Sequence, residues 1–237
     1  MTQSRTINGK AAIAFGWRTA WKNILLFLGI GVITFLISFA VDALSTAVSE
    51  LTEQQSLNAL TGLTLIFVVI AIDTVWQVFY SLGLSRLALD FIDTGKSTFG
   101  RVFSQGALLW RGLGVTLLTL LIVVVGFLLL IIPGIIWSIK YSMAMYCLVD
   151  KKLGVKESLK MSAELTRGVK WQLFGFWLVL GLINLAGFLA LVIGMVITVP
   201  LTMLAQAHVY RHLTKQAGSA SDVQPAPASA APAAPAA

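Results

Sequence analysis

The chain has 237 residues, of which 57% are hydrophobic and only 11% are charged. A typical soluble protein carries about 25% charged residues, so this chain has too few polar side chains to cover a water-soluble globule. Its mean hydropathy of +0.87 predicts a protein that folds in lipid. The net charge is +7. In a membrane protein the placement of such charge sets topology, so we do not expect nucleic acid as a partner.

Uncharged stretches predict six transmembrane helices, because one crossing of about 30 Å needs about 20 helical residues. The stretch 171–210 has 40 residues without a Lys, Arg, Asp or Glu. It must cross twice, and Pro200 is the expected point of reversal. The stretch 112–139 contains Ile132-Pro133-Gly134, where proline and glycine can end one helix and begin the next. The predicted spans are 24–43, 61–85, 112–132, 134–149, 172–197 and 200–214.

The Lys and Arg residues gather on one side of these predicted spans. Of the 17 in the chain, 16 precede the first span, follow the even-numbered spans or lie at the end of the last one. By the positive-inside rule this side is cytoplasmic, and so are both chain ends. We therefore divide the chain into a basic N-terminal interfacial segment (1–23), a six-helix transmembrane domain (24–215) and a disordered Ala- and Pro-rich cytoplasmic tail (216–237).

An internal repeat is suggested by a shift of 61 residues, which pairs Trp76 with Trp137 and Tyr80 with Tyr141. Each unit would hold a basic surface helix, a long span outward, a tight turn and a shorter span back. The surface helices would be 10–22, 98–111 and 155–170. The predicted fold class is all-α: a polytopic membrane protein whose six transmembrane helices form three repeated helical hairpins with cytoplasmic interfacial amphipathic helices.

Two ionisable residues, Asp73 and Lys140, fall well inside predicted spans, where a charge is costly and so suggests a function. In the repeat register Lys140 lies about 9 Å deeper than the position of Asp73, and its long side chain extends back toward that level. Gln77, Ser138 and Ser142 would add hydrogen-bonding groups. Such a polar intramembrane site would suit a small transporter or channel. The alternatives are a structural ion pair or two separate residues.

The third surface segment, 155–170, predicts contact with anionic lipid. A basic amphipathic helix at this position can lie in the membrane interface and bind acidic headgroups. The alternative is a solvated helix whose charges only set topology. The candidate lipid contacts are Lys156, Lys160, Arg167 and Lys170.

No residue pattern predicts catalysis, a metal or a cofactor. The chain lacks paired carboxylates, a Ser-His-Asp set and a phosphate-binding glycine loop. His208 and His212 have metal-ligand spacing, but no further ligand is near in sequence. The single cysteine, Cys147, cannot form an internal disulfide. We expect a protein that is not an enzyme and has membrane lipids as partners; a membrane-protein partner or a homo-oligomer is left open.

The stretch from Ile131 to Gly168 holds a Pro-Gly-Ile turn, a short apolar segment, a Gly-Val-x-x-Ser-Leu segment and then Ser-x-x-Leu-Thr. The residues in this pattern are Pro133, Gly134, Ile135, Gly154, Val155, Ser158, Leu159, Ser162, Leu165 and Thr166. With them the chain resembles a bacterial family of uncharacterised inner-membrane proteins, which is related to the membrane domain of some glycerophosphodiester phosphodiesterases. The resemblance implies a bacterial inner-membrane location. It implies no hydrolase activity, because the shared region has no catalytic motif.

These observations favour a non-enzymatic membrane component that organises lipid or partner proteins. The main alternative is a small transporter or channel that uses Asp73 and Lys140.

Overall fold

The structure is a computed structural model that describes residues 6–53, 58–189 and 191–222. Within these ranges every regular element is helical. The elements in chain order are α1 (Gly9–Lys22), α2 (Ile24–Glu53), α3 (Ala59–Thr94), the 3₁₀ helices η1 (Phe99–Phe103) and η2 (Gly106–Leu108), α4 (Leu109–Leu129), α5 (Ile131–Tyr141), α6 (Ala144–Lys151), α7 (Val155–Leu165), α8 (Lys170–Leu189) and α9 (Leu191–Asp222).

Five segments of the described chain are long and apolar enough to cross a membrane, and they confirm the prediction of an all-α polytopic membrane protein. The first of them has only 11% of its most apolar stretch buried within the chain, and the fourth has 39%. Most of their surface must therefore be covered by lipid or by another protein. The segments are Ile24–Glu50, Leu60–Thr94, Phe99–Leu129, Ile131–Lys151 and Lys170–Leu189.

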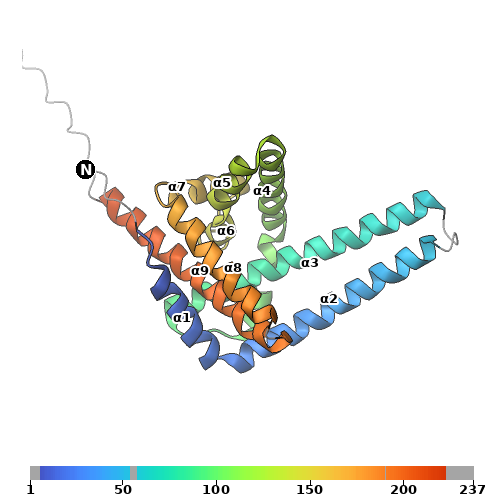
Figure 1. Cartoon of the computed structure of the whole chain (residues 1–237), viewed down its shortest axis with the longest axis horizontal. Coiled ribbons are helices and arrows are strands. Elements are labelled where there is room, and N and C mark those ends of the chain that lie inside the picture. The colour runs from blue at the N-terminus through green and yellow to red at the C-terminus, as the bar shows by residue number, and fades with distance from the viewer. Residues whose placement is uncertain (1–5, 54–57, 190, 223–237) are drawn as a thin grey trace, which may run out of the picture.

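Most of the long helices pack against a chain neighbour, and α1 packs against α9 (Figure 1). α2 and α3 form a long hairpin that extends away from the other helices, and α4 and α5 form a second hairpin in a different direction. α8 and α9 run side by side, with α1 against α9. The α1–α9 contact is close because its centre is a glycine: a Cβ added to Gly16 would lie 2.6 Å from the Leu201 carbonyl oxygen.

The best-buried part of the chain lies where the C-terminal parts of α3 and α9 meet α6. Leu87 of α3, Leu148 of α6 and Tyr210 of α9 are each fully buried there. Side chains packed this closely hold three elements together that are far apart in sequence. This junction fixes the ends of the helices, while their apolar outer surfaces are left for the bilayer.

The predicted reversal at Pro200 is wrong. α8 ends at Leu189 and α9 begins at Leu191, so Pro200 lies inside α9. A Cβ added to Gly194 would lie 2.2 Å from the Gly187 carbonyl oxygen, so two glycines allow the chain to double back earlier. Proline is tolerated within membrane helices because neighbouring groups satisfy the backbone that it leaves unpaired.

The turn between the third and fourth predicted spans lies at Leu130, three residues before the expected Pro133. Gly126 and Gly134 permit it, because a Cβ on Gly126 would lie 2.9 Å from the Gly134 Cα. The fourth span is then interrupted, since α5 ends at Tyr141 and α6 begins at Ala144.

Other boundaries also differ from those expected. α2 and α3 run past the predicted ends of their spans, to Glu53 and Thr94. The surface segment 98–111 forms two short 3₁₀ helices and the start of α4 in place of one surface helix. α9 continues to Asp222, so the first residues of the predicted tail are helical, and the rest of the tail lies outside the described residues.

Candidate binding pocket

A pocket of about 300 Å³ opens between α5, α7 and the start of α8. Its lining has four cations and one carboxylate, and hence a formal charge of +3. Cavities of this size are at the small end of those that bind ligands. The lining residues are Lys140, Lys160, Ala163, Glu164, Arg167 and Lys170.

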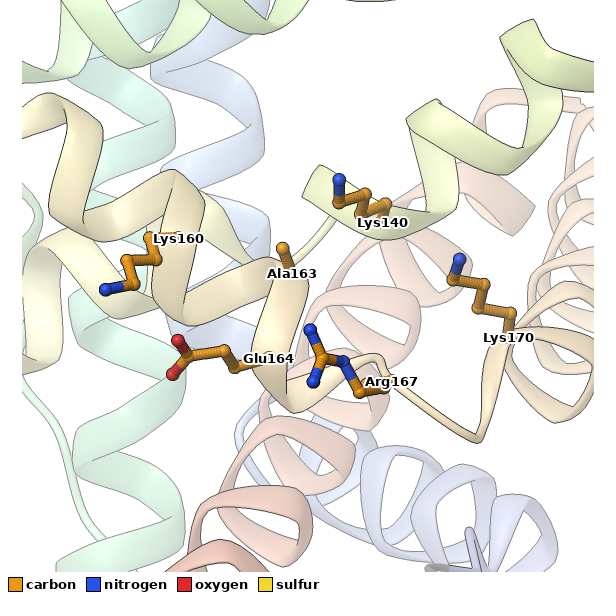
Figure 2. Close-up of a pocket in the computed structure, with 6 residues that line it drawn as sticks. All are labelled: Lys140, Lys160, Ala163, Glu164, Arg167 and Lys170. Atoms are coloured by element: carbon orange, nitrogen blue, oxygen red, sulfur yellow. The ribbon is translucent and has the colours of Figure 1, made fainter.

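The cations come from separate parts of the chain. Lys140 lies in the last turn of α5, Arg167 follows the end of α7, and Lys170 is the first residue of α8. Figure 2 shows these three side chains around one open space, with the Ala163 methyl group at its edge. Lys160 and Glu164 lie on the other side of Ala163. The pocket therefore brings together charges that are up to 30 residues apart.

None of the four cations has a carboxylate partner within 4.0 Å among the described residues. Lys140 has instead an aromatic neighbour, with Nζ 5.1 Å from the centre of the Tyr141 ring. Like charges that surround one space repel each other, and the repulsion is stronger near a low-dielectric membrane than in water. A bound anion would offset it, so the pocket is suited to an anionic ligand.

Two buried hydroxyl groups hold Lys140 in place at the break between α5 and α6. Ser162 of α7 donates a hydrogen bond to the Lys140 carbonyl oxygen (2.9 Å), and the Met143 N–H donates to Ser162 Oγ (3.2 Å). The Thr166 hydroxyl lies 3.3 Å from the same Lys140 oxygen. Both side chains are fully buried. They satisfy backbone groups that the interrupted helix leaves without a helical partner.

The start of α7 is fixed just as firmly. The Gly154 N–H donates to Glu157 Oε2 (2.9 Å), which satisfies one of the free donors at the helix N-terminus. Val155 then packs against α4. A Cβ added to Gly114 of α4 would lie 2.7 Å from Cγ2 of Val155. Ser162 and Thr166 belong to the Ile131–Gly168 sequence pattern described above. They and other residues of that pattern position the pocket without lining it.

Exposed tryptophans lie beside the pocket and at the starts of other helices. Trp171 follows Lys170 directly and is 84% exposed, and Trp110 at the start of α4 is 82% exposed. On α1, Trp17 and Trp21 form an exposed edge-to-face pair with ring centres 5.9 Å apart. Tryptophan rings favour the headgroup depth of a bilayer. The basic pocket is therefore expected at the level of lipid headgroups.

The residues of the predicted intramembrane site do not come together. Lys140 lines the basic pocket, whereas Asp73 is half-buried on α3, and no ion pair joins the two. Gln77 is exposed on α3. Ser138 and Ser142 donate to the carbonyl groups of Ile135 and Ile139 on their own helix.

Three of the four predicted lipid contacts, Lys160, Arg167 and Lys170, line the pocket. The fourth, Lys156, is exposed on α7 outside it. The described residues contain no group of three or more potential metal ligands.

Sequence reasoning missed a second charged cluster, at the junction of α3, α6 and α9. Arg211 of α9 pairs with Asp93 of α3 and with Asp150 of α6, at 2.8 Å from Asp150 Oδ1. The Tyr210 hydroxyl donates to the other Asp150 oxygen (2.9 Å). Nearby, the Asp90 carboxylate forms salt bridges with Arg86 (3.1 Å) and Arg101 (3.0 Å).

A signal for this cluster was present in the sequence. Asp150 and Arg211 lie at or next to the end of a predicted span, and Asp93 lies between predicted spans, all on the side shared by the basic residues in the predicted topology. Because the predicted topology brings these residues to one side of the membrane, opposite charges there were candidates for pairing. Each member has a partner within the chain, so the cluster joins helix ends and does not present an open ligand site.

The sequence of α4 to α9 resembles that of other proteins. Residues 112–217 match the sequence model of a family described as "Protein of unknown function (DUF975)". The match covers slightly less than half of the chain and includes every residue that lines the pocket. The curated proteins and the solved structures contain no match to the chain.

Proposed function

We propose that this polytopic membrane protein binds anionic lipid headgroups in the basic pocket, and thereby organises lipid around itself without catalysing a reaction. The observation that supports this most directly is the set of four cations around one cavity, none with a carboxylate partner within 4.0 Å in the described chain. Exposed Trp171, next to Lys170, supports a position of the cavity at headgroup depth.

We infer that α9 supplies a sixth crossing. It has 32 residues and so a length of about 48 Å, and it returns beside α8. With six crossings the Lys and Arg residues gather on one side, which would be the cytoplasmic side of a bacterial inner membrane. The pocket would then take headgroups from the inner leaflet. We also propose that the six crossings form three repeated hairpins. The relationship to the membrane domain of glycerophosphodiester phosphodiesterases likewise remains a proposal.

Topology can be tested with single cysteines in a chain whose Cys147 is replaced by alanine. Lys96→Cys and Lys156→Cys should react with a membrane-impermeant maleimide from the cytoplasmic side only. Glu50→Cys in α2 should react only from the opposite side. Labelling of Lys96→Cys and Lys156→Cys from different sides would contradict the proposed topology.

Lipid binding can be tested with purified protein in nanodiscs or mixed micelles. Binding to anionic lipid should exceed binding to neutral phosphatidylcholine and should weaken as salt increases, because screening weakens contacts between exposed charges. The double variant Arg167→Met/Lys170→Met should lose most of this preference. Lys156→Met, which removes one positive charge from α7 outside the pocket, is the matched control for each of the single variants Arg167→Met and Lys170→Met. Equal binding to anionic and neutral lipid would refute the proposal.

A small transporter or channel is the second candidate, because Lys140 lies within a candidate span and also lines a cavity. This function would require Asp73 and Lys140 to share a path, yet the described cavity includes only Lys140. Asp73→Asn should abolish flux through such a path in proteoliposomes. No flux in the unmodified protein would leave lipid binding as the function, whereas flux that is unchanged in the variant would show a path that does not use Asp73.

A further inference from the structure

We infer that the pocket selects headgroups that end in a doubly charged phosphate, a phosphomonoester, over those with a singly charged phosphodiester. This inference rests on the proposed function and names the chemical class of its ligand. Three properties of the pocket support it: its net charge, the directions from which its cations approach, and its position at the start of α8.

The net charge of the lining favours a ligand with more than one negative charge. Four cations and Glu164 give a formal +3. A phosphodiester carries a single charge and would leave most of this positive charge without compensation. A phosphomonoester carries about −1.5 to −2 at pH 7 and so offsets about twice as much. Charge matching of this kind discriminates between ligands more than it sets their overall affinity.

The arrangement of the cations suits a terminal phosphate group. Arg167 can donate two parallel hydrogen bonds to two oxygens, whereas Lys140 and Lys170 act as point charges on other sides of the space. A terminal phosphate offers three free oxygens to such donors. A phosphodiester has only two, because the second ester bond occupies the third, and it would leave one cation without a contact.

The start of α8 adds a further positive contribution. Lys170 is the first residue of this 20-residue helix, and the first turn contains no acidic residue. The unpaired N–H groups at a helix N-terminus carry partial positive charge, which favours anions within about one turn. Ala163, the one apolar residue of the lining, brings no donor or acceptor. Apart from Glu164, the lining therefore has no side-chain acceptor with which to recognise a sugar or an amine in the headgroup.

The test compares short-chain lipids with the full-length protein in detergent. Dioctanoyl phosphatidic acid, phosphatidylglycerol and phosphatidylcholine are titrated at pH 7.5, and binding is followed by calorimetry. We expect phosphatidic acid to bind about tenfold more tightly than phosphatidylglycerol, the factor that one additional charge-assisted hydrogen bond supplies. At pH 5.5 this ratio should shrink, because a phosphomonoester takes up its second proton near pH 6. The affinity for phosphatidylglycerol, measured at both pH values, is the internal control.

Variants identify the pocket as the place of binding. Lys140→Met should weaken binding of phosphatidic acid about tenfold and reduce its advantage over phosphatidylglycerol. Arg167→Lys keeps the charge but loses the two parallel hydrogen bonds, and should reduce the same ratio. Lys156→Met should change neither. The comparison of lipids on the unmodified protein remains decisive even where a variant fails to fold.

The outcomes separate the inference from the proposed function. Equal affinity for phosphatidic acid and phosphatidylglycerol, both above phosphatidylcholine, would overturn the inference and leave anionic lipid binding intact. Equal affinity for all three lipids would overturn both. Inorganic phosphate and glycerol 3-phosphate form the last arm: if either bound as tightly as phosphatidic acid, the ligand would be a soluble phosphate, and selection of a lipid headgroup would be refuted.

Discussion

Ser162 should be the most sensitive of the hydroxyl residues on α7, because it completes two hydrogen bonds at once. Its Oγ donates to the Lys140 carbonyl oxygen (2.9 Å) and accepts from the Met143 N–H (3.2 Å). In the Ser162→Ala variant, the Lys140 carbonyl oxygen still has the Thr166 hydroxyl as a hydrogen-bond donor, at 3.3 Å. The Met143 N–H loses its partner in a fully buried site. An unsatisfied buried donor costs about 1–3 kcal/mol, and we expect a loss of that size in the free energy of unfolding.

Ser158→Ala is the matched control, since Ser158 is on the same helix and is also fully buried. Its hydroxyl donates only to the Gly154 carbonyl (2.8 Å), and that oxygen keeps a bond from the Ser158 N–H (2.9 Å). Its loss should cost about 0.5 kcal/mol. Both free energies can be measured by equilibrium unfolding with SDS in mixed micelles. If Ser162→Ala were no more destabilising than Ser158→Ala, the role of Ser162 at the helix break would be refuted.

Two further pairs of substitutions test the packing of the helices. Arg211→Met leaves the buried Asp150 carboxylate without its closest cation, 2.8 Å away, and should lower the free energy of unfolding by about 3 kcal/mol. Lys151→Met removes only an exposed partner 3.8 Å from Asp150 and should lower it by less than about 1 kcal/mol. Equal losses for the two variants in SDS unfolding would contradict the role of Arg211 in this cluster. Gly126→Ala places a Cβ 2.8 Å from a Trp137 ring carbon and 2.9 Å from a backbone atom, and should cost about 1–3 kcal/mol. Gly181→Ala meets no atom within 4 Å and should be neutral or stabilising; a thermal melt in detergent that gave the reverse order would refute the α4–α5 contact.

The membrane character of the chain could be predicted because it depends on composition and on the length of uncharged stretches. The start of the first span, Ile24, was predicted to the residue, since Lys22 and Asn23 end the polar segment before it. The reversal between α8 and α9 could not be predicted in this way. Proline is the stronger turn signal in soluble proteins. Here the close approach of Gly187 and Gly194 permits the turn, and such a contact is a property of tertiary packing.

The pocket was predicted only in part, for a related reason. Lys160, Arg167 and Lys170 lie close together in sequence and were expected to face lipid as a group. Lys140 was assigned to mid-membrane because an uninterrupted helix from 134 to 149 would have placed it there. The break after Tyr141 contains neither proline nor glycine, and hydroxyl groups from a different helix stabilise it, so no local pattern indicates it.

The break also explains how the chain can carry a lysine in so apolar a segment. A lysine in the middle of a span costs several kcal/mol, but at the end of a helix its side chain can extend toward the headgroups. By ending α5 at Tyr141, the chain places Lys140 in the last turn of a helix and within the space that Arg167 and Lys170 surround. The interruption of the span and the collection of charge in the pocket are therefore one structural feature. A change that restored a continuous helix here should weaken anion binding even if all four cations remained.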